Sequence, residues 1–200
     1  RHDSVGVQAA DTLTKMLQMP EPQSLPLRVN MGSRCFFTDD SAHVWQPEQA
    51  YTQGSWGYVG GEAFTKKTKY GQLPAADVDI LGTDQDPLYQ TARVGVEMFR
   101  ADVPAGQYRV VLHFAELESR EKEQMSVYNL GNEAIDTDFR GREMVVRVQD
   151  LPGDTINLTR QYGRYRAVEL HYTVEAQDGI VIRFESLKGE TLLNGIEIMN

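Results

Sequence analysis

The sequence predicts an all-β protein in which two sheets pack as a jelly-roll-like β-sandwich. Three observations lead to this fold class. Apolar and polar residues alternate with a period of two along several stretches of the second half, turn-forming residues separate these stretches, and no long amphipathic helix pattern follows residue 26. A chain of 200 residues is long enough to bury the core of one such domain.

The predicted strands are clearest in the second half of the chain. Along 166–175, Val168, Leu170 and Tyr172 point to one side, while Glu169 and His171 point to the other. The same alternation predicts strands at 27–31, 107–115, 143–148 and 180–185. The turn-like separators are 104–106, 130–132, 152–154, 177–179 and 188–189. Strands at this spacing are typical of a two-sheet sandwich.

Between residues 34 and 88 glycine and proline recur, and we expect loops and tight turns there. The aromatic residues in or just after this stretch are Trp45, Tyr51, Trp56, Tyr58, Phe64, Tyr70 and Tyr89. Such rings either anchor loops or stack on ligands, and the pattern alone favours anchors. Cys35, which precedes two phenylalanines, is expected to be a small buried side chain.

The chain is expected to contain two parts. We interpret residues 1–26 as the end of a preceding domain followed by a proline-rich linker, and residues 27–200 as one β-sandwich domain. The chain begins at Arg1 without a methionine or a signal peptide. That start indicates a fragment or a processed product of a longer polypeptide.

Charge and composition argue against several functional classes. A net charge of −9 disfavours nucleic acid and anionic lipid as partners, whereas a neutral ligand such as a sugar is unaffected by it. No apolar run approaches the roughly 18 residues of a membrane span. No nucleophile elbow or phosphate-binding motif is found, and we expect no cofactor.

Candidate metal ligands are sparse. The histidines are His2, His43, His113 and His171. They show no ligand spacing, and we interpret them as surface or rim residues. One loop carries four aspartates, which are Asp77, Asp79, Asp84 and Asp86. They form either a structural calcium site or, as we favour, a solvated acidic turn. A small basic cluster, Lys66, Lys67 and Lys69, is interpreted as a solvated loop.

Several segments taken together resemble the malectin-like domains. In chain order they are 28–32 (RVNMG), Trp45, Tyr51, 57–61 (GYVGG), 86–93 (DPLYQTAR), 104–108 (PAGQY), 112–116 (LHFAE) and 194–198 (NGIEI). The resemblance spans residues 27–200. It implies a jelly-roll-like sandwich that binds carbohydrate, of the kind appended C-terminally to bacterial family 2 glycoside hydrolases, which are β-galactosidase-like. It also implies a periplasmic or extracellular location.

The resemblance carries the family's sugar-binding positions onto this sequence only in part. The stacking tyrosine after the early glycines matches Tyr58, or Trp56 in a shifted register. The other aromatic positions of the family hold Val94, Glu118 and Ser119 here. The family's C-terminal aspartate corresponds to Glu190.

The polar partners expected for sugar hydroxyls are Arg93 and Glu116, which end two of these segments, and Glu118, which follows the second of them. Arg93 and Glu116 could instead form a structural ion pair between those segments, and this alternative is favoured.

These residues predict a non-catalytic carbohydrate-binding accessory module of a larger glycoside hydrolase. In this role, a carbohydrate and the catalytic domain of the same polypeptide would be the partners. The alternative is a structural domain that docks on that enzyme and binds no free sugar. An autonomous sandwich-fold glycosidase ranks last, because it needs two carboxylates facing each other across a cleft.

Overall fold

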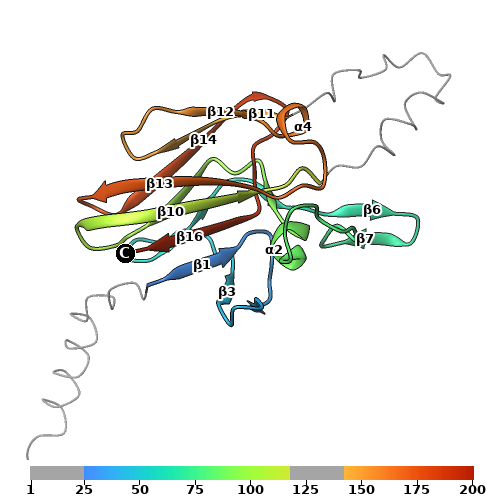
Figure 1. The fold of residues 1–200 in the computed structure, drawn as a ribbon, viewed down its shortest axis with the longest axis horizontal. Helices are drawn as coiled ribbons and strands as arrows, with labels where there is room; N and C mark the ends of the chain where they lie inside the picture. The colour runs from blue at the N-terminus through green and yellow to red at the C-terminus, as the bar shows by residue number, and fades with distance from the viewer. Residues whose placement is uncertain (1–24, 118–141) are drawn as a thin grey trace, which may run out of the picture.

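The computed structural model describes residues 25–117 and 142–200, and they form a β-sandwich (Figure 1). One layer is a six-stranded sheet with the order β13-β10-β16-β1-β3-β2. Its strands are β1 (Leu27–Asn30), β2 (Phe37–Thr38), β3 (Val44–Pro47), β10 (Gly106–Phe114), β13 (Val168–Ala176) and β16 (Gly195–Met199). All pairings in this sheet are antiparallel except that of β1 with β3.

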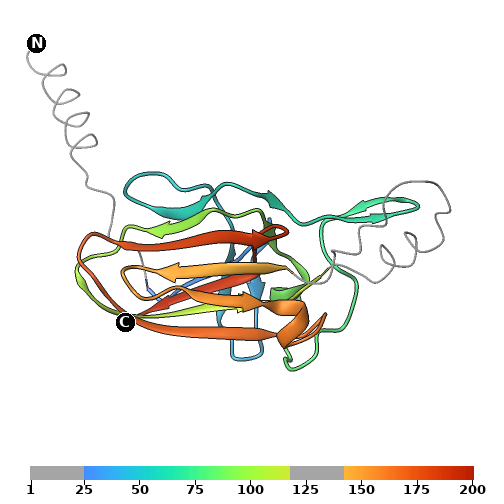
Figure 2. The ribbon, with the colours of Figure 1, turned by 90° about the horizontal axis from the view of Figure 1, so that it is seen from above.

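The second layer is a five-stranded antiparallel sheet with the order β12-β11-β14-β9-β4. Its strands are β4 (Trp56–Val59), β9 (Met98–Ala101), β11 (Glu143–Val148), β12 (Asp154–Asn157) and β14 (Ile180–Lys188). Figure 2 shows the long strands of the two layers running roughly along the same direction, as in aligned sandwiches.

Two smaller sheets and two short helices complete the described part of the chain. A three-stranded sheet has the order β15-β8-β5, with β5 (Glu62–Ala63), β8 (Arg93–Val94) and β15 (Leu192–Leu193). The hairpin of β6 (Lys66–Thr68) and β7 (Gly71–Leu73) forms a sheet of its own and projects away from the two layers (Figure 1). The helices are α2 (Asp86–Gln90) and α4 (Leu158–Gln161).

The core lies between the two large sheets and follows the alternation of their sequences. On β10, Val110, Leu112 and Phe114 are buried, and they face inward together. The opposite layer contributes Met144 and Ile182, which are also fully buried. Side chains at every second position therefore fill the space between the layers, which is the expected consequence of the strand period.

The structure confirms the predicted fold class and corrects several local expectations. The predicted strand at 143–148 is present with the same ends, and those at 27–31, 107–115, 166–175 and 180–185 are present with ends that differ by at most three residues. The stretch 34–88 is more ordered than expected, because it contains six short strands and most of α2. Residues 1–24 and the predicted turn at 130–132 lie outside the described residues. In the part that is described, no helix is long and apolar enough to cross a membrane.

Two further expectations about burial were wrong. Cys35 is exposed rather than buried, and it lies in a bend between β1 and β2 rather than on a strand face. His113 is buried rather than at the rim. The Tyr89 hydroxyl lies 2.8 Å from His113 Nδ1, and the Trp45 ring packs edge-on against the imidazole. The histidine thus faces outward from the sheet but is covered by α2 and β3.

The loop before β4 is attached to the end of β9 by one carboxylate. Asp102 accepts hydrogen bonds from the Tyr51 hydroxyl at 2.8 Å, the Gly54 N–H at 2.7 Å and Arg100 Nε at 2.6 Å. Burial by itself raises the pKa of the Asp102 carboxyl, but these hydrogen bonds outweigh burial and bring the pKa below its ordinary value of 3.8. The ionised form is therefore favoured by folding.

We predict that Asp102→Asn lowers the free energy of unfolding at pH 7 by roughly 1–3 kcal/mol, because charge-assisted hydrogen bonds are lost. A carboxyl whose pKa falls on folding stabilises the protein above its unfolded pKa and loses that contribution on acidification. The difference between wild type and variant should therefore shrink as the pH falls below about 4. Urea denaturation across pH 3–7 measures this, with the exposed Asp150→Asn as control. A difference that is independent of pH would contradict the assignment.

Candidate functional site

The small three-stranded sheet forms the floor of a surface hollow. In the central strand β8, Val94 pairs with Glu62 of β5 on one side and with Leu192 of β15 on the other. The two flanking strands come from regions of the sequence that are about 130 residues apart. Residues that are distant in the chain therefore meet in one row across this sheet.

The hollow is open and has a volume of about 480 Å³. Its lining residues are Gly61, Glu62, Ala63, Phe64, Thr65, Val94, Gly95 and Glu190. The Val94 and Phe64 side chains make it partly apolar, and the exposed Glu62 and Glu190 add two carboxylates. A Cβ atom on Gly95 would lie 3.7 Å from Glu190 Oε1, so this carboxylate lies above the backbone that follows Val94. No basic side chain is among the lining residues.

Gly61 allows the close approach of β5 to β8 at the edge of the hollow. Its φ is +72°, and a Cβ atom at this position would lie 2.4 Å from the Val94 carbonyl oxygen. Both the backbone conformation and the missing space require glycine here.

A buried ion pair supports the Gly61 side of the hollow. Arg93 Nε lies 2.9 Å from Glu48 Oε2, and Arg93 Nη1 donates to the Gly61 carbonyl oxygen at 2.9 Å. The guanidinium carbon also lies 3.2 Å from the centre of the Tyr58 ring and covers that face. Burial raises the pKa of the Glu48 carboxyl, although the Gly32 N–H and Arg93 act in the opposite direction. The Arg93 guanidinium is thus engaged by Glu48, Gly61 and Tyr58 of the protein itself.

A second buried ion pair supports the Glu190 side. Arg142 Nε lies 3.1 Å from Glu116 Oε2, and both side chains are almost fully buried. Arg142 Nη1 donates to the carbonyl oxygens of Glu190 and, at 3.2 Å, of Thr191. The buried Arg142–Glu116 pair therefore fixes the backbone that carries the Glu190 side chain.

The buried amide of Asn194 fixes the position of β8 itself. Its Nδ2 donates to the carbonyl oxygens of Tyr89 at 2.9 Å and of Thr91 at 2.8 Å. Its Oδ1 accepts from the Ala115 N–H at 2.7 Å. Asn194 directly follows β15. Its hydrogen bonds therefore connect the end of β15 to the residues that precede the neighbouring strand β8.

The structure places the predicted site residues in three different situations. Glu190 lines the hollow, together with Val94. Trp56 is 5% exposed and stacks on Phe99 in the core, and Tyr58 is half-buried with one ring face covered by Arg93. Neither ring lines the hollow.

Arg93 and Glu116 are 6% and 3% exposed. Arg93 forms an ion pair with Glu48, and Glu116 forms one with Arg142. Each pairs with a different partner, so the predicted pair between the two segments is not the one that forms. Glu118 and Ser119 lie outside the described residues.

The sequence did not mark Glu62 in the lining, or Glu48 and Arg142 in the supporting pairs. It marked Phe64 only among the aromatic residues for which loop anchoring was favoured over ligand stacking. Glu62 and Phe64 flank Ala63 directly after the glycine pair, and their position next to that motif was the available signal. Glu48 lies 45 residues from Arg93, and Arg142 lies 26 residues from Glu116. No local pattern marks partners at such separations.

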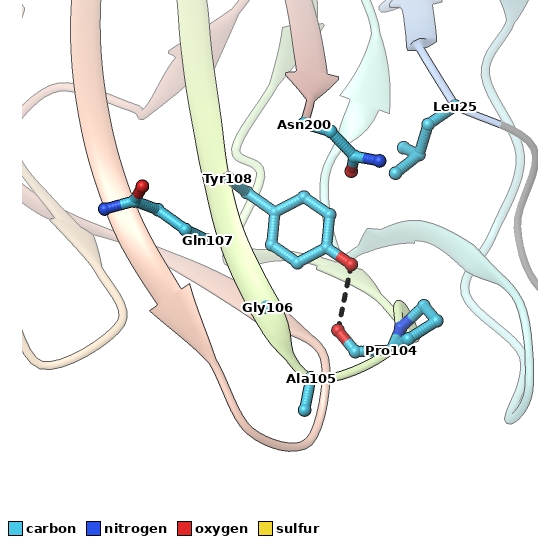
Figure 3. A pocket seen from close by; sticks show the side chains of 7 residues that line it. All are labelled: Leu25, Pro104, Ala105, Gly106, Gln107, Tyr108 and Asn200. Carbon is cyan, nitrogen blue, oxygen red and sulfur yellow. Dashed lines mark hydrogen bonds between the residues drawn. The ribbon is translucent and has the colours of Figure 1, made fainter.

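A second hollow of about 540 Å³ lies near the start of β10 and the last residue, Asn200 (Figure 3). Its lining residues are Leu25, Pro104, Ala105, Gly106, Gln107, Tyr108 and Asn200. The Tyr108 hydroxyl donates to the Pro104 carbonyl oxygen at 2.9 Å, so it is engaged within the protein. This lining contains no charged side chain and only one aromatic ring.

Potential metal ligands are not clustered in the described part of the chain. Within residues 25–117 and 142–200, no group of three or more His, Cys, Asp or Glu side chains is arranged to hold a metal ion. The four aspartates of the 77–86 loop are among these residues. Of them, Asp86 accepts a hydrogen bond from the Ile80 N–H at 3.2 Å. The calcium site stays a prediction.

Comparisons with known proteins identify relatives of this domain. The family model described as the malectin domain matches residues 25–196. The crystal structure of Bacteroides uniformis beta-glucuronidase is 31% identical with a TM-score of 0.69, covering 88% of this chain and 18% of that one. The chain thus corresponds to less than a fifth of that enzyme's length. A search of curated proteins found no match.

More distant structures share the fold alone. The plant receptor-like kinase FER is 16% identical with a TM-score of 0.59, and the match covers 86% of this chain and 48% of that one. The ANXUR1 extracellular domain from Arabidopsis thaliana is 15% identical with a TM-score of 0.54, covering 86% of this chain and 47% of that one.

We predict that Glu48→Gln lowers the free energy of unfolding by about 3 kcal/mol, because it leaves the buried Arg93 without a counter-charge. Urea denaturation at pH 7 measures the change. The exposed Glu62→Gln, on the strand that pairs with β8, is the matched control and should stay within about 0.5 kcal/mol of wild type. Equal effects of the two substitutions would show that the ion pair does not support this wall of the hollow.

Proposed function

The chain belongs to the malectin domain family, and from this premise we propose that it is a non-catalytic carbohydrate-binding module whose ligand lies in the hollow above β8. One observation carries the proposal. Val94 and Glu190 correspond to two sugar-binding positions of the family, lie almost a hundred residues apart, and line the same hollow.

The chemistry of the lining suits a sugar. A pyranose presents C–H groups on its faces and hydroxyls around its edge. Val94 and Phe64 offer apolar surface for the C–H groups, while Glu62 and Glu190 can accept hydrogen bonds from hydroxyls. The hollow is open, which suits part of a longer glycan better than a fully enclosed monosaccharide. With Phe64 as the one ring in this lining, we expect weak binding.

Weak binding is sufficient for an accessory module. When such a domain is tethered to a catalytic domain, it raises the local concentration of the shared substrate without any need for tight binding. The similarity to about a fifth of a Bacteroides beta-glucuronidase supports a place within a larger glycoside hydrolase. The β-galactosidase-like activity of that parent and its periplasmic or extracellular location belong to the same proposal.

The alternative is a docking domain without free-sugar binding, and a specific observation favours it. Val94 stands where the family has a ring, and Tyr58 has one face covered by the Arg93 guanidinium. Each missing stacking contact removes roughly 1 kcal/mol of affinity. A docking role predicts no binding of the isolated chain to any glycan.

A glycan array followed by titration calorimetry with the isolated chain separates the two roles. The proposal expects millimolar or tighter binding to at least one oligosaccharide, weakened by Glu190→Gln and unchanged in Glu185→Gln. Glu185 is an exposed carboxylate of β14 and does not line the hollow. Absence of binding at millimolar glycan supports the docking role. If the wild-type chain hydrolyses the glycan and Glu190→Gln abolishes that hydrolysis, the chain is instead a catalyst.

We predict that Val94→Tyr strengthens binding to the array's best oligosaccharide about fivefold. The substitution adds a stacking ring to the floor, and such a ring contributes roughly 1 kcal/mol. Val94 is half-buried at the hollow, so the larger side chain can extend into open space. Calorimetry checks the affinity, and a thermal melt checks that the variant is folded. Unchanged affinity in a folded variant would place the ligand elsewhere.

A further inference from the structure

The β6–β7 hairpin is an isolated basic element in an acidic chain. The segment 63–76 contains three lysines and no aspartate or glutamate, whereas the whole chain has a net charge of −9. The two strands pair with each other and belong to neither large sheet nor the three-stranded sheet. Figures 1 and 2 both show the hairpin extending beyond the body of the domain.

The tip of the hairpin exposes an aromatic ring beside a cation. Tyr70 is 88% exposed, which is the highest value among the exposed large hydrophobic residues that the structure describes. Lys69 Nζ lies 4.8 Å from the centre of its ring. The turn is ordered by the Thr68 hydroxyl, which accepts from the Tyr70 N–H at 3.2 Å and donates to the Gly71 carbonyl oxygen at 3.0 Å. The ring is therefore presented by a defined turn and contributes nothing to the core.

The hairpin also continues the wall of the hollow. Phe64 and Thr65 line the hollow, and Lys66, the next residue, begins β6. At the rise of an extended strand, the hairpin reaches about 13 Å beyond Lys66. A glycan chain that leaves the hollow on this side meets two lysines and an exposed ring.

We propose that the hairpin is a second binding site, which takes an anionic polysaccharide carrying carboxylate or sulfate groups. A tyrosine ring stacks on the C–H face of a sugar, and the adjacent ammonium group forms a charge-assisted hydrogen bond to its anionic substituent. The hollow cannot take that substituent, because Glu62 and Glu190 would repel it. The anionic units therefore lie on the hairpin. The continuity of the hairpin with the hollow bears on this site only under the proposed function of the hollow, whereas the lysines and the exposed ring do not depend on that function.

The experiment titrates the full chain with polygalacturonate, dextran sulfate and neutral dextran by affinity electrophoresis. The first two polymers distinguish carboxylate from sulfate recognition. We expect wild type to bind at least one of them at low salt, with loss of binding between about 50 and 500 mM salt as the charges are screened. The double substitution Lys66→Gln with Lys69→Gln should weaken this binding about tenfold, and Tyr70→Ala should weaken it severalfold.

The control removes two exposed cations elsewhere, by Arg147→Gln with Arg183→Gln on β11 and β14, and should leave binding unchanged. Polyglutamate tests the alternative of an acidic protein surface, since it offers carboxylates without sugar rings. Binding to polyglutamate that equals polysaccharide binding and is insensitive to Tyr70→Ala would overturn the proposal. Binding to neither acidic polysaccharide would also overturn it. The proposed function of the hollow is tested separately, by the binding of the array's best oligosaccharide and its weakening in Glu190→Gln.

Discussion

The position of the candidate site depends on the side chain of a single buried asparagine. Asn194 is completely buried, and its amide binds two carbonyl oxygens ahead of β8 and one N–H at the end of β10. A buried amide group without a hydrogen-bond partner costs about 1–3 kcal/mol, and this cost keeps these segments at hydrogen-bonding distance from Asn194. β8 has only two residues and few ladder hydrogen bonds of its own. This amide therefore helps to fix the place of β8 between β5 and β15, and thus the floor of the hollow.

The charged groups around the hollow divide into two functions. Arg93 and Arg142 are buried with Glu48 and Glu116, and both arginines donate to backbone carbonyls at opposite sides of the hollow. Such pairs resemble ligand-binding groups in the sequence, yet their hydrogen bonds are used inside the protein. The exposed carboxylates of the lining, by contrast, are accessible from solvent and are the groups proposed to contact a ligand. Substitutions in the buried pairs would therefore act on binding through the shape of the hollow, whereas those in the lining would act on it directly.

The distribution of charge separates the two proposed binding surfaces. The hollow lacks basic lining residues and carries two glutamates, while the adjoining hairpin carries lysines without acidic residues. The two lie next to each other along the chain, because Thr65 belongs to the first and Lys66 to the second. A glycan with neutral and anionic units in alternation would find complementary surface for both. The net charge of the chain hides this local contrast.

The sequence by itself determined the fold class, the family and most long strands. This was possible because period-two alternation is a local signal that each strand carries within its own residues, as Val168, Leu170 and Tyr172 do in β13. The family motifs likewise marked Val94 and Glu190. Only the tertiary structure decided which marked residues line the hollow. Trp56 and Tyr58 have similar sequence surroundings, but Phe99 and Arg93 occupy their faces. The partners of Arg93 and Glu116, and the meeting of Glu62 with Glu190 in one hollow, depend on contacts between residues far apart in the chain, which no local pattern encodes.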